Sequence, residues 1–108
     1  MPVGDDSVWQ IVMFDLPVKT KVQRKLATNF RNALLDLGFV MQQFSVYVQY
    51  FPSGARAVPV VKKIRSQVPP SGQVRIVTVT DTQWSKSFRF VAAEEQKPEE
   101  PPSQLQIF

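Results

Sequence analysis

The sequence predicts an α+β fold built on one sheet, and three observations support this prediction. Segments 8–14, 43–51 and 73–80 are rich in Val, Ile, Phe and Tyr, as is typical of strands. Segments 20–37 and 57–68 instead carry apolar residues at helical spacing. The two kinds of pattern alternate along a chain of 108 residues, which is long enough for one domain with a single core.

The first strand and the first helix have clear boundaries. Residues 8–14 are apolar on both faces of a strand, which predicts a central position in the sheet, and Pro17 forces a turn after them. Thr20 and Gln23 fit a capping box, so a helix should start there and end at Gly38. The helix would bury one apolar stripe, made of Val22, Leu26, Phe30, Ala33, Leu34 and Leu37.

The second half repeats this order. From Gln43 to residue 51 the chain alternates strictly, while residues 39–41 form either a separate short strand or a bulged start. Pro59 is tolerated only in a first helical turn, so the second helix should begin near Ala57 or start irregularly. Its inner side would carry Val58, Val61, Ile64, Arg65 and Val68. We expect a strand at 73–80, a loop at 81–86 and a short strand at 87–92.

The order strand, helix, strand, strand, helix, strand predicts a ferredoxin-like βαββαβ domain over residues 1–93, with two helices on one face of an antiparallel sheet. Residues 94–103 are rich in Glu and Pro, which predicts a linker. The chain then becomes apolar again at Leu105, Ile107 and Phe108, so residues 104–108 are expected to form a docking strand. The alternative is a free end without a partner.

Composition excludes several kinds of chemistry. The chain has no His and no Cys, so neither Ser-His-Asp and Cys-His nucleophiles nor His and Cys zinc sites can be built. Its four glycines form no phosphate-binding loop. Oxygen-ligand chemistry with Mg²⁺ or Mn²⁺ remains open. The N-terminus does not resemble a signal peptide and no apolar run is long enough to span a membrane, so we expect a soluble cytoplasmic protein.

Asp15 is the acidic residue best placed for such chemistry, because it follows the first strand directly. Two interpretations are open. Its carboxylate caps the following turn, or it binds a metal together with the same residue of a second copy across a two-fold axis. Asp5, Asp6 and Asp36 are expected to be solvated, and Asp81 to cap its own loop.

The basic residues point to a polyanion partner. Residues 1–93 contain twelve of the thirteen Lys and Arg residues but only five of the nine acidic residues. Lys19, Lys21 and Arg24 cluster after the first strand, and Arg75 lies on a later strand. Spread charges with few aromatic residues between them favour phosphate contacts along a duplex over base stacking. The plain alternative is that these charges only form a solvated surface.

Three segments resemble the Cas-two (Cas2) family of CRISPR-associated proteins, most closely its type II variants. They are VMFDLP at residues 12–17, GFVMQQFSVY at 38–47 and VTVTDTQW at 77–84, which fall in the family's order, and LQIF at 105–108 resembles the family's last strand. The resemblance implies a homodimer in which the last strand joins the partner's sheet through Leu105, Ile107 and Phe108. It also implies a catalytic metal site for Mg²⁺ or Mn²⁺ at Asp15.

The resemblance further implies a role in spacer acquisition, as a scaffold that binds double-stranded prespacer DNA together with the Cas-one integrase (Cas1). Phosphate contacts then map onto Lys19, Lys21, Arg24 and Arg75. Family members are described as metal-dependent endonucleases acting on RNA or DNA. Since the residues offer no general base besides Asp15, we expect slow or conditional cleavage.

Two other functions fit the same fold. An RNA-binding module would display aromatic side chains on the open face of the sheet, where Tyr47 and Phe90 are candidates. A toxin-type ribonuclease would cleave RNA and arrest growth.

Overall fold

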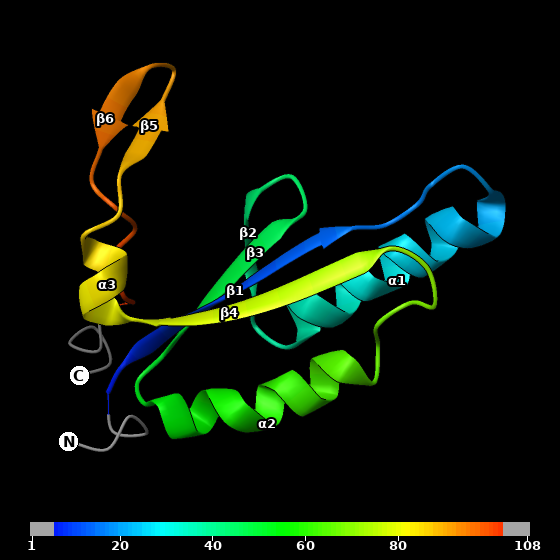
Figure 1. The fold of residues 1–108 in the computed structure, drawn as a ribbon, viewed down its shortest axis with the longest axis horizontal. Helices are drawn as coiled ribbons and strands as arrows, with labels where there is room; N and C mark the ends of the chain where they lie inside the picture. Colours follow the sequence, from blue (N-terminus) through cyan, green and yellow to red (C-terminus); the bar gives the residue numbers. More distant parts are fainter. Residues whose placement is uncertain (1–5, 103–108) are drawn as a thin grey trace.

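Four strands form an antiparallel sheet in the order β2-β3-β1-β4, as a ferredoxin-like fold requires. The structure is a computed structural model that describes residues 6–102. Helices α1 and α2 both lie on one side of the sheet (Figure 1). The elements of this body are β1 (Val8–Asp15), α1 (Lys21–Asp36), β2 (Val40–Gln43), β3 (Val46–Phe51), α2 (Gly54–Arg65) and β4 (Gln73–Thr80).

Strand β1 is central, as predicted, because it pairs with β3 on one side and β4 on the other. Its apolar residues alternate between the two faces of the sheet. Val12 and Phe14 point toward the helices and pack in a buried cluster with Phe30, Leu34 and Ile64. The neighbouring residues of β1, including Asp15, therefore belong to the opposite, open face.

Helix α1 starts with the predicted capping box. The Thr20 hydroxyl accepts a hydrogen bond from the Gln23 backbone N–H at 3.0 Å, and the Gln23 side chain accepts one from the Thr20 N–H at 3.0 Å. The predicted stripe is wrong at Val22, which is 68% exposed, while Ala27 is buried. The reason is that the first turn of α1 extends past the end of the sheet (Figure 1), where no element of residues 6–102 covers it.

Residues 39–51 form a hairpin, which confirms the separate short strand and shows that a continuous strand from Gln43 is wrong. Strand β2 ends at Gln43 and β3 begins at Val46. Between them Ser45 takes a φ of 63°, and Phe44 at the tip is 93% exposed. Tyr47 lies in the core cluster on the helix side, because it is the cross-strand partner of Val12, which also faces the helices.

Helix α2 begins at Gly54, earlier than predicted, and contains Pro59. Its inner side carries Ala57 and Ile64. The predicted inner residues Val58, Arg65 and Val68 are instead exposed. The ring of Pro59 lies on the exposed side of the helix. The carbonyl that lacks a partner there belongs to an exposed turn, where water can satisfy it, so the helix tolerates the proline.

The segment after β4 differs most from the prediction. The expected loop forms helix α3 (Asp81–Ser85), and strands β5 (Arg89–Val91) and β6 (Glu94–Gln96) pair as a hairpin. This hairpin projects away from α2 (Figure 1). The expected linker at 94–103 thus starts with a strand. The docking strand expected at 104–108 lies outside the described residues.

The chain after the hairpin returns to the body through the two tryptophans. The indole N–H of Trp84 donates to the Glu99 carbonyl at 2.9 Å, and Trp84 stacks on Trp9 with 4.6 Å between ring centroids. These contacts explain why this segment, although rich in Glu and Pro, is ordered against the sheet. No helix within residues 6–102 is long and apolar enough to cross a membrane.

Candidate metal and nucleic-acid site

Asp15 is the last residue of β1, and it is exposed. Strand alternation places it with Met13 on the open face of the sheet, away from both helices. Within residues 6–102 its carboxylate takes part in no hydrogen bond and no ion pair with another side chain or with the backbone of the following turn. The carboxylate is therefore open to solvent at the end of a central strand.

The backbone at this strand end is held on both sides. The Phe14 backbone N–H donates to the Ser45 carbonyl in the β2–β3 turn at 3.0 Å. On the other side Asp15 is the partner of Gln73, the first residue of β4. The carboxylate thus projects from a backbone that neighbouring strands fix in place.

A shallow hollow surrounds Asp15. It is lined by Met13, Phe14, Asp15, Gln73 and Arg75. Arg75 is the cross-strand partner of Met13, so its side chain lies on the same open face as Asp15. Arg75 and Asp15 form no ion pair in the described part of the chain. The hollow therefore combines a carboxylate, an amide and a guanidinium group. The guanidinium group does not pair with the carboxylate, so the carboxylate charge is not neutralised.

Gln73 is a member of this hollow that the sequence did not indicate. A glutamine at the start of a strand is unremarkable in sequence, and only the register between β1 and β4 brings it beside Asp15. No local pattern could have identified it.

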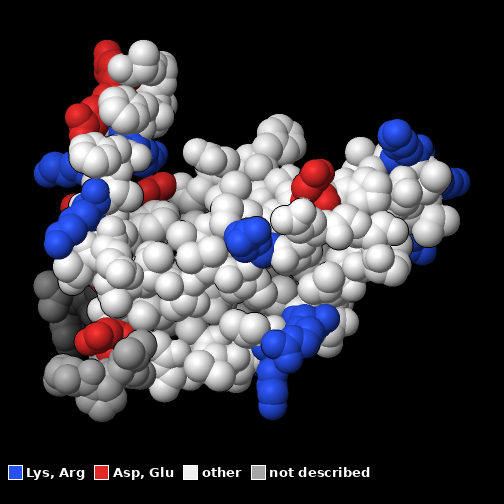
Figure 2. All heavy atoms as spheres, viewed as in Figure 1, with Lys and Arg blue, Asp and Glu red and all other residues white. Residues whose placement is uncertain are grey.

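Three of the predicted nucleic-acid contacts lie together where α1 begins. Lys19 and Lys21 flank the N-cap of α1, and Arg24 lies one turn further. Figure 2 shows basic side chains gathered at this end of the molecule. Arg24 also has a structural role, because its Nη1 donates to the carbonyls of Val18 at 3.2 Å and Lys19 at 3.0 Å.

Other basic side chains lie over the second half of α2, and basic and acidic groups mix on the β5–β6 hairpin (Figure 2). There the Arg89 Nε lies 3.5 Å from a Glu99 carboxylate oxygen. Asp81, which was expected to cap its own loop, instead accepts a hydrogen bond from the Trp9 indole N–H at 2.7 Å, while Thr80 is the N-cap of α3. The Asp81 carboxylate thus has a structural role in joining α3 to β1.

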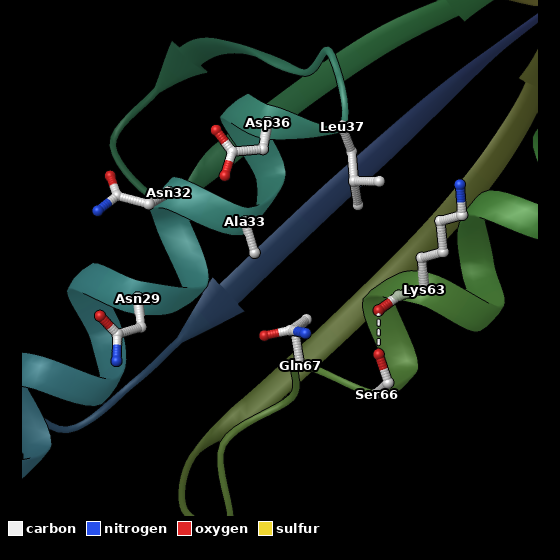
Figure 3. A pocket seen from close by; sticks show the side chains of 8 residues that line it. All are labelled: Asn29, Asn32, Ala33, Asp36, Leu37, Lys63, Ser66 and Gln67. Atoms are coloured by element: carbon white, nitrogen blue, oxygen red, sulfur yellow. Dashed lines mark hydrogen bonds between the residues drawn. The ribbon is translucent and has the colours of Figure 1, made fainter.

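A second, polar groove runs between α1 and the end of α2 on the helix side (Figure 3). Ala33 and Leu37 form part of its wall, and Ser66 donates to the Lys63 carbonyl at 2.7 Å beside it. None of the predicted site residues lines this groove. The open face and the helix side of the molecule therefore offer separate surfaces.

The described part of one chain does not provide a complete metal site. Within residues 6–102 no three acidic side chains gather in a metal-binding arrangement, and the chain has no His or Cys. Asp15 offers a single carboxylate, and Mg²⁺ is usually held by one or two carboxylates, with water and substrate phosphates as further ligands. The predicted contact residues Leu105, Ile107 and Phe108 lie outside the described residues.

Comparison with known proteins gives a consistent result. The family model described as CRISPR associated protein Cas2 matches residues 8–87. A protein of Paracidovorax avenae is 42% identical over 108 residues, which is 100% of both chains. One of Flavobacterium psychrophilum is 37% identical over 94% of this chain and 89% of its own. One of Parvibaculum lavamentivorans is 42% identical over 94% of this chain and 100% of its own. All three are named CRISPR-associated endoribonuclease Cas2.

Proposed function

The chain belongs to the Cas2 family of CRISPR-associated proteins, and we propose that it acts in spacer acquisition as a homodimer that binds duplex nucleic acid and cleaves phosphodiester bonds slowly at Asp15. The observation that carries this proposal is the exposed Asp15 carboxylate at the tip of the central strand, beside Arg75. Because the relatives are named endoribonucleases, RNA is the first substrate to test.

The metal would be Mg²⁺ or Mn²⁺, held by Asp15 of both subunits. The donor set supports this choice, because carboxylate oxygens are the hard ligands that these ions prefer. The Asp15 carboxylate is also available, since it has no hydrogen-bond or ion-pair partner in the described chain. A bound ion would supply charge neutralisation and a more acidic water. Arg75 would orient a substrate phosphate at the same hollow, and Gln73 would donate a hydrogen bond to it.

The number of ligands supports the homodimer. One chain offers one carboxylate in this hollow, and a two-fold axis next to the strand end would bring a second. Residues Leu105, Ile107 and Phe108 would strengthen the dimer by adding a strand to the partner's sheet.

DNA binding would rest on the basic end of the molecule. Lys19, Lys21 and Arg24 project around the start of α1, and in a dimer two such ends would form separated phosphate contacts along a duplex. The Cas1 integrase would bind this dimer, which would bridge two integrase dimers. This scaffold role needs no cleavage by Asp15.

Replacing Asp15 by Asn should lower metal-dependent cleavage of RNA or DNA by at least about 100-fold, because it removes the charged ligand while keeping the shape. Mixed dimers test the pairing. Wild-type and D15N chains are refolded together at several ratios and assayed with Mn²⁺. If each site needs both carboxylates, activity falls with the square of the wild-type fraction.

The control is duplex DNA binding, which D15N should retain because Asp15 makes no phosphate contact of its own. A linear decrease of activity with the wild-type fraction would contradict the shared site. Full activity of D15N itself would contradict any role of Asp15 in cleavage.

The structure offers less support for a plain RNA-binding module. Tyr47, one of the two aromatic residues considered for base stacking, is buried on the helix side of the sheet. Phe90 is exposed, but it lies on the β5–β6 hairpin rather than on the four-stranded sheet. The open face of the sheet therefore lacks the pair of exposed aromatic rings that such modules use.

A further inference from the structure

Gly72 makes an unusually close approach to the end of β1. It lies directly before β4 and has a φ of 90°, which residues with a side chain rarely adopt. A Cβ atom at this position would lie 2.5 Å from the Asp15 carbonyl oxygen and 3.0 Å from the Leu16 Cα. Both of these are backbone atoms, which cannot rotate away as the end of a long side chain can.

A side chain at position 72 would collide with the peptide that joins Asp15 to Leu16. Phe14 is anchored to the Ser45 carbonyl, and the pair Asp15–Gln73 is the last rung between β1 and β4. Pro17 restricts Leu16 to an extended conformation. A side chain at position 72 therefore has to push the Asp15–Leu16 peptide or the start of β4, and either movement changes where the carboxylate lies relative to Gln73 and Arg75.

We propose that Gly72 is a positioning residue for the Asp15 carboxylate. This proposal rests on the proposed function of Asp15. Ordinary contact begins near 3.4 Å, so a Cβ atom at 2.5 Å requires a shift of about 1 Å. Misplacement of a reacting group by that distance can lower a rate by about 100-fold.

The chain contains a matched control. Gly38 also has a positive φ, of 99°, but a Cβ atom there meets the Gln49 side-chain amide rather than backbone. Gly38→Ala and Gly72→Ala thus impose similar backbone strain, and only the second disturbs Asp15. A third variant, Gly72→Asn, separates strain from collision, because Asn tolerates positive φ yet still carries a Cβ atom.

The experiment measures metal binding and cleavage in the full chain, at a temperature where all variants are folded. Mn²⁺ titration followed by NMR should broaden the amide signals of Asp15, Leu16 and Gln73 in the wild type. Gly72→Ala and Gly72→Asn should shift these signals before metal is added, require at least about tenfold more Mn²⁺ for the broadening, and lower kcat by about 100-fold. Gly38→Ala should resemble the wild type in all three measurements.

The outcomes separate this inference from the function on which it rests. A wild type that shows neither Mn²⁺ broadening at Asp15 nor cleavage refutes the proposed function and the inference with it. An active wild type together with an equally active Gly72→Ala refutes the positioning role alone. Recovery of wild-type metal binding in Gly72→Asn would also refute it, because backbone strain rather than the close approach would then be the cause.

Discussion

Single residues show where the fold departs from simple rules. Gln10 lies on the helix side of β1 and is 1% exposed, although its neighbours on that face are apolar. Its Nε2 makes two long hydrogen bonds, to the Thr78 hydroxyl at 3.4 Å and the Ala57 carbonyl at 3.5 Å. Its Oε1 is buried without a partner in the described chain. Such a group gains little from its contacts and loses its hydration.

Replacing Gln10 by Met should therefore raise the free energy of unfolding by about 1 kcal/mol, because it keeps the volume and removes the unpaired oxygen. Urea unfolding followed by circular dichroism measures the change. Gln67→Met on the exposed surface is the control and should stay within about 0.5 kcal/mol of the wild type. A loss of stability in Gln10→Met would show that the amide has a stronger partner than these contacts.

Two residues of the hollow, Asp15 and Arg75, were predicted from the sequence, whereas Gln73 and the neighbouring Gly72 were not. The apolar run ending in an acid and a proline was enough to place the carboxylate at a strand tip. Gln73 and Gly72 come beside it only through the pairing of β1 with β4, which spans more than fifty residues of chain. Register of that kind is set by the whole sheet and leaves no local pattern.

At the scale of elements, the start of α1 was predicted correctly because it depends on contacts within one turn. The capping box of α1 joins residues three apart, so its sequence signature is sufficient. The strict alternation over 43–51 predicted one continuous strand, but a turn at Ser45 divides the segment into two paired strands. Helix α3 has the same Thr and Gln signature as α1, at Thr80 and Gln83. Its five residues are too few to form a helix alone, and stacking of Trp84 on Trp9 holds it.

The two capping boxes allow a paired test. Thr20→Ala and Thr80→Ala should each lower the free energy of unfolding by about 1 kcal/mol. Only Thr20→Ala should also weaken duplex DNA binding, because losing the Thr20 hydroxyl loosens the first turn of α1, and the Gln23 side chain in that turn accepts a hydrogen bond from the Lys19 N–H. Fluorescence anisotropy with a labelled duplex measures the affinity. Equal loss of affinity in both variants would point to global destabilisation instead.

At the scale of the whole molecule, charge is distributed unevenly. The end at the start of α1 is basic, whereas the β5–β6 hairpin mixes both signs and pairs Arg89 with Glu99 (Figure 2). The order of elements was enough to predict the ferredoxin-like body. The sequence did not predict the hairpin, because residues rich in Glu and Pro have no pattern that favours a strand, and its place depends on tertiary contacts with Trp84.

The uneven charge predicts a salt dependence that differs between lysines. If Lys19 and Lys21 contact phosphates, each Ala substitution removes one contact per subunit, and therefore two in the proposed homodimer. At about 0.9 per phosphate contact, it should reduce the slope of log K against log salt concentration by about 1.8 on a duplex. Lys97→Ala, next to the hairpin, should leave the slope unchanged. Binding measured from about 50 to 200 mM salt tests this. Equal slopes in all three variants would place the phosphate contacts elsewhere.

The stacked indoles of Trp9 and Trp84 have a practical consequence. They are the only two tryptophans of the chain, their planes differ by 14°, and one of them holds the Glu99 carbonyl. All indole emission therefore originates from one corner of the molecule. Intrinsic tryptophan fluorescence should therefore report, without any added dye, whether the segment around Glu99 stays in contact with the sheet.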